Sequence, residues 1–227
     1  MKRQPVIILL IFFFVIPVSA STPADGAFDF VSTSVDKVLT ILRDPACKEE
    51  STREVQRQKL RTIVETLFDC DEISRRVLGR NRKSFTPEQM DEFSDLFTRL
   101  LEKIYLDKIQ KYSDEKVIYG KATMLSENKA EVETNVVTAS KQIPINYRVV
   151  YKHGEWSGYD VIIEGVSLVR NYRSQFNKIL QKKTPEDLLQ QLREKVNKEE
   201  APTKKAALLK ENCITTGGEF CRETAQL

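Results

Sequence analysis

The chain has 227 residues, with 36 lysines and arginines against 33 aspartates and glutamates, and its formal net charge is +3 at pH 7. Loss of Lys2 and Arg3 with a cleaved leader brings the charge close to zero, so long-range attraction to nucleic acid or to an anionic membrane is not expected. Acidic and basic residues are interleaved, as on a solvated surface, and the length suits one domain with its own core.

The beginning of the chain is typical of a secretory signal peptide. A basic start, "MKR", precedes an apolar run over residues 6–18, and small residues precede a cut after Ala20. An uncleaved membrane anchor is the alternative, but the run is short for a bilayer span. We therefore expect residues 1–20 to be removed, residues 21–196 to form the folded domain and residues 197–227 to be a flexible tail.

Four amphipathic helices are predicted in the first half of the mature chain. Their apolar residues recur at the three-to-four-residue spacing of a helix face, over residues 28–42, 51–68, 71–79 and 86–109. The last has the clearest start, because Thr86 can cap it, Pro87 suits the first helical position and Gln89 completes a capping box.

The ends of the other three helices are marked less clearly. Asp44 and Pro45 should end the first. Ser51 and Glu54 have the spacing of a capping box for the second. Gly79 can end the third in a left-handed conformation.

The hydrophobic period then changes to two. Four alternating segments joined by short polar turns predict antiparallel strands, over residues 115–124, 129–139, 143–152 and 155–165. Gly158 inside the fourth predicts a bulge or a bend. The helical period returns after Gly165, and a second capped helix begins at Thr184 and continues to Val196. The predicted class is α+β, with N-terminal helices, a curved four-stranded antiparallel sheet and C-terminal helices on one face of the sheet.

The cysteines are Cys47, Cys70, Cys213 and Cys221. An even number in an oxidising compartment favours disulfides over metal binding, and Cys213 and Cys221 could close a small loop in the tail. Cys47 and Cys70 bracket a predicted helix, whose ends lie roughly 25–30 Å apart, whereas a disulfide needs Cα atoms within about 7 Å. That pairing is doubtful. Zinc is not expected, because no C-x-x-C spacing occurs and His153 is the only histidine.

The residues give a catalytic site little support. His153 lies in the turn "KHGEW", where an exposed histidine is common, and Ser167 lacks the second glycine of a nucleophile elbow. Asp160 and Glu164 should share one face of a strand, roughly 13 Å apart, which is too far for a glycosidase carboxylate pair. We expect both carboxylates to face outward, toward basic residues or backbone N–H groups.

A binding site has more support, because apolar residues gather where the helices and the sheet should meet. They are Phe97, Leu101, Tyr105, Tyr147, Val149, Val161, Ile163, Val166, Leu168 and Tyr172. Periodicity alone favours ordinary core packing for these residues, since it does not reveal whether the two layers touch or enclose a space.

Two stretches carry a resemblance to a known family. They are "RRVLGR…SFTPEQMDEFSDLFTRLLEKIY" and "YRVVYKHGEWSGYDVIIEGVSLVRNYRSQFNKIL". They resemble the MlaC (toluene-tolerance) family of periplasmic phospholipid-binding proteins, and the similarity extends from about Ala27 to Val196. The loop "GRNRKSF" departs from the pattern, since relatives often carry an extra aromatic residue there. The four cysteines and the tail also lie outside the pattern.

The resemblance implies a carrier without catalytic activity, cofactor or metal. Such proteins move glycerophospholipids between an outer-membrane lipoprotein complex and an inner-membrane ABC transporter of the Mla type, with the acyl chains in an apolar cavity between helices and sheet. Contact with membranes would be made only through these partners, and nucleic acid is not a partner. The ten residues named above would line the cavity, and the junction from Gly165 to Leu168 would close one side of it.

Two other functions remain open from the residues. One is a protein-binding scaffold module with a filled core. The other is a lipid-modifying hydrolase that uses Ser167 or His153.

Overall fold

The computed structural model describes residues 23–47, 50–110 and 115–198. Helices and strands follow one another in the predicted order, helices first, then the sheet, then helices. The helices are α1 (Pro23–Arg43), α2 (Arg53–Leu67), α3 (Cys70–Leu78), α4 (Pro87–Ile109), α5 (Leu168–Leu180) and α6 (Pro185–Lys198), with 3-10 turns η1 (Pro45–Cys47), η2 (Glu50–Thr52) and η3 (Gly79–Ser84). The strands are β1 (Lys116–Ser126), β2 (Lys129–Val137), β3 (Gln142–Lys152), β4 (Glu155–Ile163) and β5 (Val166–Ser167).

The strands form one antiparallel sheet in the order β1-β2-β3-β4-β5. The α+β class and the four-stranded antiparallel meander are therefore confirmed, and the short β5 is an addition. A tight turn places Val166 opposite Ile163. The turn residues Glu164 and Gly165 have φ angles of 49° and 82°. Glycine adopts the second of these without steric cost.

The bulge predicted at Gly158 is present in β4. Arg148 pairs with Asp160 and Val149 pairs with Gly158, which leaves Tyr159 as the extra residue. A Cβ on Gly158 would lie 2.6 Å from a ring carbon of Phe68. The chain between α2 and α3 therefore runs directly against β4, and the amide of Asp69 donates to the carbonyl of Gly158 at 3.0 Å.

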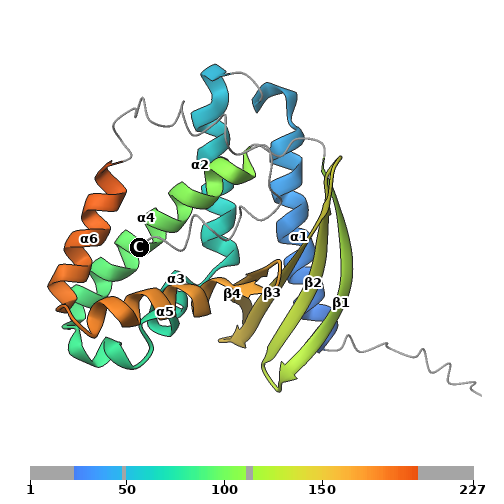
Figure 1. The fold of residues 1–227 in the computed structure, drawn as a ribbon. Helices are drawn as coiled ribbons and strands as arrows, with labels where there is room; N and C mark the ends of the chain where they lie inside the picture. The colour runs from blue at the N-terminus through green and yellow to red at the C-terminus, as the bar shows by residue number, and fades with distance from the viewer. Residues whose placement is uncertain (1–22, 48–49, 111–114, 199–227) are drawn as a thin grey trace, which may run out of the picture.

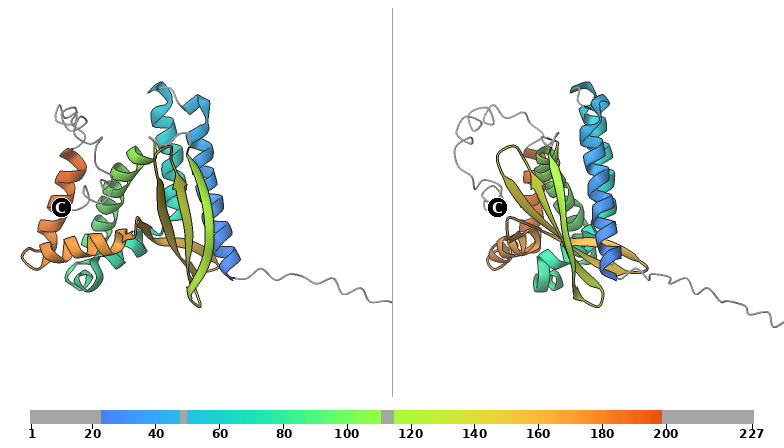
Figure 2. Two further views of the ribbon diagram at one scale, coloured as in Figure 1. Left: turned by 45° about the vertical axis from the view of Figure 1, so that its right-hand side comes forward. Right: turned by 90° about the vertical axis from the view of Figure 1, so that its right-hand side faces the viewer.

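The helices cover one face of the sheet. In Figure 1 the sheet forms one side of the molecule, with α1 along β1 and β2 and the other helices beyond it. Figure 2 shows α1 and α2 side by side, apart from the group formed by α3, α5 and α6. Two separate apolar clusters match this division. One joins α1 to β1–β3, and the other joins α3, α4, α5 and α6 around Phe93, Phe97 and Phe176.

The helix ends agree with the sequence in two places and differ in three. Thr86 and Gln89 form the expected capping box, and α1 ends at Arg43, directly before Asp44 and Pro45. The box expected from Ser51 is wrong, because α2 begins at Arg53 and Thr52 makes no capping hydrogen bond. Helix α1 begins at Pro23, five residues before Phe28. Gly79 ends α3 with φ 57° and ψ −121°, which has positive φ but is not the left-handed helical region.

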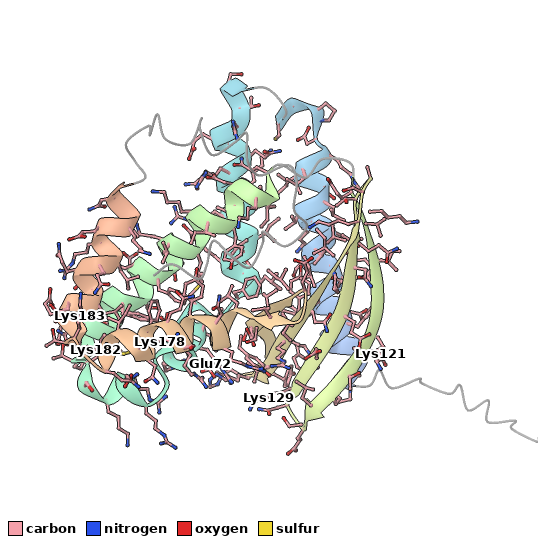
Figure 3. All side chains as sticks on the ribbon, viewed as in Figure 1. Glu72, Lys121, Lys129, Lys178, Lys182 and Lys183 are labelled. Atoms are coloured by element: carbon pink, nitrogen blue, oxygen red, sulfur yellow. The ribbon has the colours of Figure 1, made fainter. Side chains whose placement is uncertain are left out.

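A partly buried ion pair joins helix α3 to strand β3 of the sheet. Lys152 of β3 lies 2.9 Å from Glu72, which also pairs with Arg76 at 2.6 Å. Figure 3 shows Glu72 below the junction of α3 and the sheet. Burial alone would raise the pKa of Glu72, but the hydrogen bonds from Lys152 and Arg76 outweigh it and lower the pKa to about 2. This carboxylate is therefore charged throughout the ordinary pH range.

None of the helices within residues 23–47, 50–110 and 115–198 is long and apolar enough to cross a membrane. The predicted signal peptide and almost all of the predicted tail lie outside the residues that the structure describes.

Candidate functional site

A cavity lies between the sheet and helices α1, α2 and α4. Its volume, measured as space open to the centre of a water molecule, is about 240 Å³. Most of its wall comes from apolar side chains of three helices and four strands. They are Val35, Val38, Leu39 and Leu42 of α1, Val64 and Leu67 of α2, Leu101, Tyr105, Leu106 and Ile109 of α4, Val117 of β1, Val136 of β2, Ile143, Ile145 and Tyr147 of β3, and Val161 and Ile163 of β4.

Three segments close the end of the cavity near α3 and α5. Phe68, Cys70 and Ile73 contribute from the connection into α3 and from α3 itself, and Leu168 contributes from the first position of α5. Lys108 and Glu115, which flank the undescribed residues 111–114, also contribute to the wall. Charged side chains therefore accompany the link between α4 and β1, while the rest of the wall is chiefly apolar.

The chiefly apolar wall suits an apolar guest. An apolar cavity of roughly 150 Å³ in another protein accepts benzene, and this cavity is larger. The hydroxyl of Thr134 donates to the carbonyl of Ile145 at 2.6 Å, so it is already satisfied. Burial also raises the pKa of Tyr147 to about 12. An apolar guest would therefore break few hydrogen bonds.

One ion pair borders the cavity between α2 and α4. Arg61 contacts Glu102 through two bonds, Nε to Oε1 at 3.0 Å and Nη2 to Oε2 at 2.8 Å. Burial raises the pKa of Glu102, although Arg61 opposes the shift. Burial likewise raises the pKa of the Cys70 thiol. Both effects are what a wall of low polarity produces.

Six of the ten residues predicted for the binding seam lie around this cavity. They are Leu101, Tyr105, Tyr147, Val161, Ile163 and Leu168. They come from α4, β3, β4 and the start of α5, so the structure brings together residues that are up to 67 positions apart in the chain.

The other four residues lie elsewhere, and each has a packing reason. Phe97 and Tyr172 are 1% exposed and contact each other, with ring centroids 4.9 Å apart, in the cluster of α3–α6. Val149 is 0% exposed because it packs in the cluster beneath α1. Val166 is 41% exposed at the edge strand β5.

Sequence reasoning missed the contribution of α1 and α2. Val35, Val38, Leu39 and Leu42 belong to the apolar stripe that predicted α1, and Ile143 and Ile145 belong to the same alternating series as Tyr147. The periodic signal was therefore present. It did not distinguish residues that face a partner layer from residues that face an open space.

The expected orientation of Asp160 is wrong. This residue is only 4% exposed. It accepts hydrogen bonds from the hydroxyl of Ser167 at 2.6 Å and from the amide of Val169 at 3.0 Å, with Arg148 at 3.7 Å. The partner types are the expected ones, but the carboxylate points inward, where it holds the first turn of α5 against the sheet.

Glu164 does not share a strand face with Asp160, because β4 ends at Ile163 and Glu164 lies in the turn to β5. The strand-to-helix junction therefore works as a rigid corner at the end of the cavity. Asp160, Ser167 and the amides of α5 satisfy one another there.

The geometry does not favour a hydrolase. Ser167 is buried and serves as the N-cap of α5, accepting from the amide of Arg170 at 3.1 Å. His153 is exposed in the β3–β4 turn, at the opposite end of β4. Nine residues of strand separate it from the level of Ser167, which corresponds to more than about 25 Å. The only histidine therefore lies far from the only proposed nucleophile.

Metal binding finds no support in the residues described. They contain no group of three or more histidine, cysteine, aspartate or glutamate side chains placed to hold an ion. Cys47 and Cys70 are both free thiols, which agrees with the doubt about their pairing. Cys213 and Cys221 lie outside the described residues.

The chain is similar to proteins of known name in sequence and in structure. A toluene tolerance protein, ttg2D, of Pseudomonas putida is 25% identical over 182 residues, which is 79% of this chain and 83% of that protein. The intermembrane phospholipid transport system binding protein MlaC of Haemophilus influenzae is 28% identical over 144 residues, which is 60% of this chain and 67% of that protein.

A solved structure has the same fold. It is a phospholipid-binding protein from Ralstonia solanacearum in complex with a phospholipid, with a TM-score of 0.69 and 25% identity, covering 76% of this chain and 97% of that one. The family model described as "MlaC protein" matches residues 32–194, which include α2–α5, the whole sheet, the second half of α1 and most of α6. The chain therefore belongs to the MlaC family, whose proteins are periplasmic, non-enzymatic phospholipid carriers.

Proposed function

We propose that this protein is a phospholipid-binding shuttle of an intermembrane Mla-type transport system. The observation that carries the proposal is the apolar cavity between the sheet and α1, α2 and α4. Its position in the fold, between the two layers, is the one that a carrier of acyl chains requires. A scaffold module with a filled core has no use for such a space.

The energetics of the cargo explain why a cavity is needed. Each methylene group left in water costs about 0.8 kcal/mol. Two chains of roughly sixteen carbons would therefore cost on the order of 20 kcal/mol in the aqueous compartment. A dry, apolar wall removes this cost without any charged group, catalytic group or cofactor.

We propose that the acyl chains contact the six predicted residues that border the cavity. Tyr147, Val161 and Ile163 form the sheet side, and Leu101 and Tyr105 form the helix side. Leu168 lies at the corner held by Asp160. Phe97, Tyr172, Val149 and Val166, which lie away from the cavity, are not part of the proposed contact surface.

The volume of the cavity sets a further expectation. Sites for drug-sized ligands usually measure about 300–1,000 Å³, and a two-chain lipid is larger than the 240 Å³ present here. We therefore expect the walls to move apart as the lipid enters. The head group would remain in water, where it needs no dedicated charge pocket.

The cellular location and the protein partners follow from the same proposal. Export would use the apolar leader, with cleavage after Ala20. The protein would exchange glycerophospholipids between an outer-membrane lipoprotein complex and an inner-membrane ABC transporter of the Mla type, and it would approach membranes only through these partners.

The proposal is tested by extracting the purified mature protein with organic solvent and analysing the extract by mass spectrometry. We expect glycerophospholipid in near-stoichiometric amount. A protein that neither co-purifies with phospholipid nor takes it up from vesicles would contradict the proposal. Release of lysolipid or free fatty acid that disappears in His153→Ala or Ser167→Ala would favour a hydrolase instead.

A further inference from the structure

Two neighbouring segments carry basic residues and no acidic ones. Helix η3, Gly79–Ser84, contains Arg80, Arg82 and Lys83. The segment from Leu168 to residue 183, which is α5 and the turn after it, contains five cations, Arg170, Arg173, Lys178, Lys182 and Lys183. Neither segment contains an aspartate or a glutamate. In a chain of 36 basic and 33 acidic residues, this is a local separation of charge that the near-zero total conceals.

The two segments lie against each other. The side-chain amide nitrogen of Asn81 donates to the side-chain oxygen of Asn177 at 3.0 Å. Arg173 packs beside Gly79, since a Cβ built on Gly79 would lie 3.5 Å from Nε of Arg173. The same Nε donates to the carbonyl of Arg76 at 2.7 Å. Arg173 therefore joins α5 to α3. Figure 3 shows Lys178, Lys182 and Lys183 together along the outer end of α5, far from Lys121 on the sheet.

The remaining basic residues of the two segments are all exposed. They are Arg80, Arg82, Lys83, Arg170, Lys178, Lys182 and Lys183, and we refer to them as the cationic face. Within the described parts of the chain, none of them forms a salt bridge with an acidic residue. A few carboxylates lie near the edges of the face, since Lys183 interacts electrostatically with Asp187 and Arg82 and Lys83 line a pocket with Asp71 and Asp91. Other arginines are paired internally, such as Arg57 with Asp107 and Arg193 with Glu92. Like charges that outnumber the nearby counter-charges repel one another, so the cationic face has a cost to the fold that an external acidic partner would offset.

We propose that the cationic face is the surface by which this protein docks on an acidic face of its protein partners in the membrane complexes. The inference rests on the proposed function, because it supplies the docking step that a shuttle requires. We define the partner by its chemistry. It presents a surface with an excess of aspartate and glutamate, and this surface is about as long as α5.

The exposed side chains favour a protein partner over a bilayer. Binding at a lipid surface combines cationic attraction with insertion of apolar side chains. Among the described residues the exposed large apolar side chains are Val55, Ile118, Leu125, Tyr151 and Val166. Only Val166 adjoins the cationic face in sequence. A charged face without apolar anchors gives fast, salt-sensitive and reversible association, which suits a carrier that must leave each partner.

The cationic face is connected to the cavity through α5. Leu168 at the start of this helix borders the cavity, and the amide of Val169 is held by Asp160, which also borders it. A partner that binds along α5 would therefore hold the helix whose first turn closes the cavity.

The test measures association of the full mature protein with the purified periplasmic portions of the two proposed partner complexes. The test variant is Lys178→Glu, Lys182→Glu and Lys183→Glu combined, with Lys→Gln at the same positions as an intermediate. The matched control is Lys116→Glu, Lys121→Glu and Lys141→Glu, which changes the net charge equally on exposed residues outside η3 and α5. Association rates are measured by surface plasmon resonance at about 50 mM and about 300 mM salt, which changes the screening length.

We expect the test variant to associate on the order of tenfold more slowly at low salt, the Gln variant to be intermediate and the control to match the wild type. Replacement of acidic residues on the partner by lysine should restore the rate of the test variant. Equal rates for the test variant and the control would overturn the proposal, as would equally strong, salt-sensitive binding of the wild type to vesicles containing phosphatidylglycerol without any partner protein.

Lipid content is measured on the same preparations. A wild type without phospholipid would contradict the proposed function. A lipid-loaded protein whose docking ignores these lysines would contradict only the docking surface.

Discussion

A carboxyl group placed on the cavity wall should expel the lipid in a pH-dependent way. Val161 lies in β4 on the cavity side and is only half-buried, because part of its surface faces the cavity. Val161→Glu puts an ionisable group where the proposed acyl chain would lie. Without lipid, water can reach this group. With lipid bound, the cavity is dry and the carboxylate must be neutralised or buried as a charge.

The expected loss of lipid affinity follows from the less costly of these two possibilities, which is protonation of the carboxylate. Glutamate has an ordinary pKa of about 4.3, and each pH unit corresponds to about 1.36 kcal/mol, so protonation at about pH 7 costs about 3.7 kcal/mol. This corresponds to about 500-fold weaker lipid binding. At about pH 5 the cost falls to about 1 kcal/mol, or about fivefold. The introduced carboxyl has a raised pKa in the lipid-bound form, so binding strengthens as the pH falls.

Competition between bound lipid and a fluorescent phospholipid, at both pH values, measures the effect. In Val161→Gln the introduced glutamine has nearly the same shape as glutamate but does not titrate. Its loss of lipid affinity should therefore be smaller and should not change with pH. Ile162→Glu adds the same charge on the neighbouring residue, which does not border the cavity, and should keep the lipid. Wild-type affinity in Val161→Glu at neutral pH, or a loss that does not recover on acidification, would refute the assignment of Val161 to the wall.

Three further outcomes concern stability. Val149→Glu should unfold the protein rather than merely release lipid, because Val149 is 0% exposed and an unpaired buried charge costs several kcal/mol; a wild-type denaturation midpoint would contradict this. Gly158→Ala should destabilise by about 1–3 kcal/mol, since its Cβ would lie 2.6 Å from the ring of Phe68, and Phe68→Leu should recover part of the loss in urea titrations. Glu72→Gln should cost about 1–2 kcal/mol near pH 7 after allowance for solvent screening. Because the folded pKa of Glu72 is lowered to about 2 by Lys152 and Arg76, that difference should be complete above the unfolded pKa of 4.5, shrink as the pH falls below it, and vanish only below about pH 2. A pH-independent difference would exclude the ion pair as its cause.

Local patterns predicted the order and type of the main elements. The period change after residue 115 marks the sheet, and the box of Thr86 and Gln89 marks α4 to the residue. Gly158 predicted the bulge in β4. These features depend on neighbours within a few positions, which is why a single sequence contains them. The capping box at Ser51 failed because the chain forms a 3-10 turn before α2.

The candidate site could be predicted only in part. Tyr147 and Val161 were expected at the seam and do border the cavity, whereas Phe97 and Tyr172 have the same apolar character and fill a core. Asp160 was expected outside and is buried, because β5 turns back beside β4 and brings Ser167 and the amide of Val169 to its carboxylate. The cationic face is not evident from the sequence, because its two segments are some 85 residues apart and the total charge is near zero.

The sequence by itself determined which residues are apolar, where the periods change and which ends are capped, since these depend on propensity and on short spacing. The tertiary structure alone decided that parts of α1, α2 and α4 border a space beside the sheet, whereas α3, α5 and α6 pack with the rest of α4 into a filled core. The physical reason is that the hydrophobic effect rewards removal of apolar surface from water and is non-directional. It drives the same side chains into a packed core or around a cavity, and only the placement of the layers separates the two.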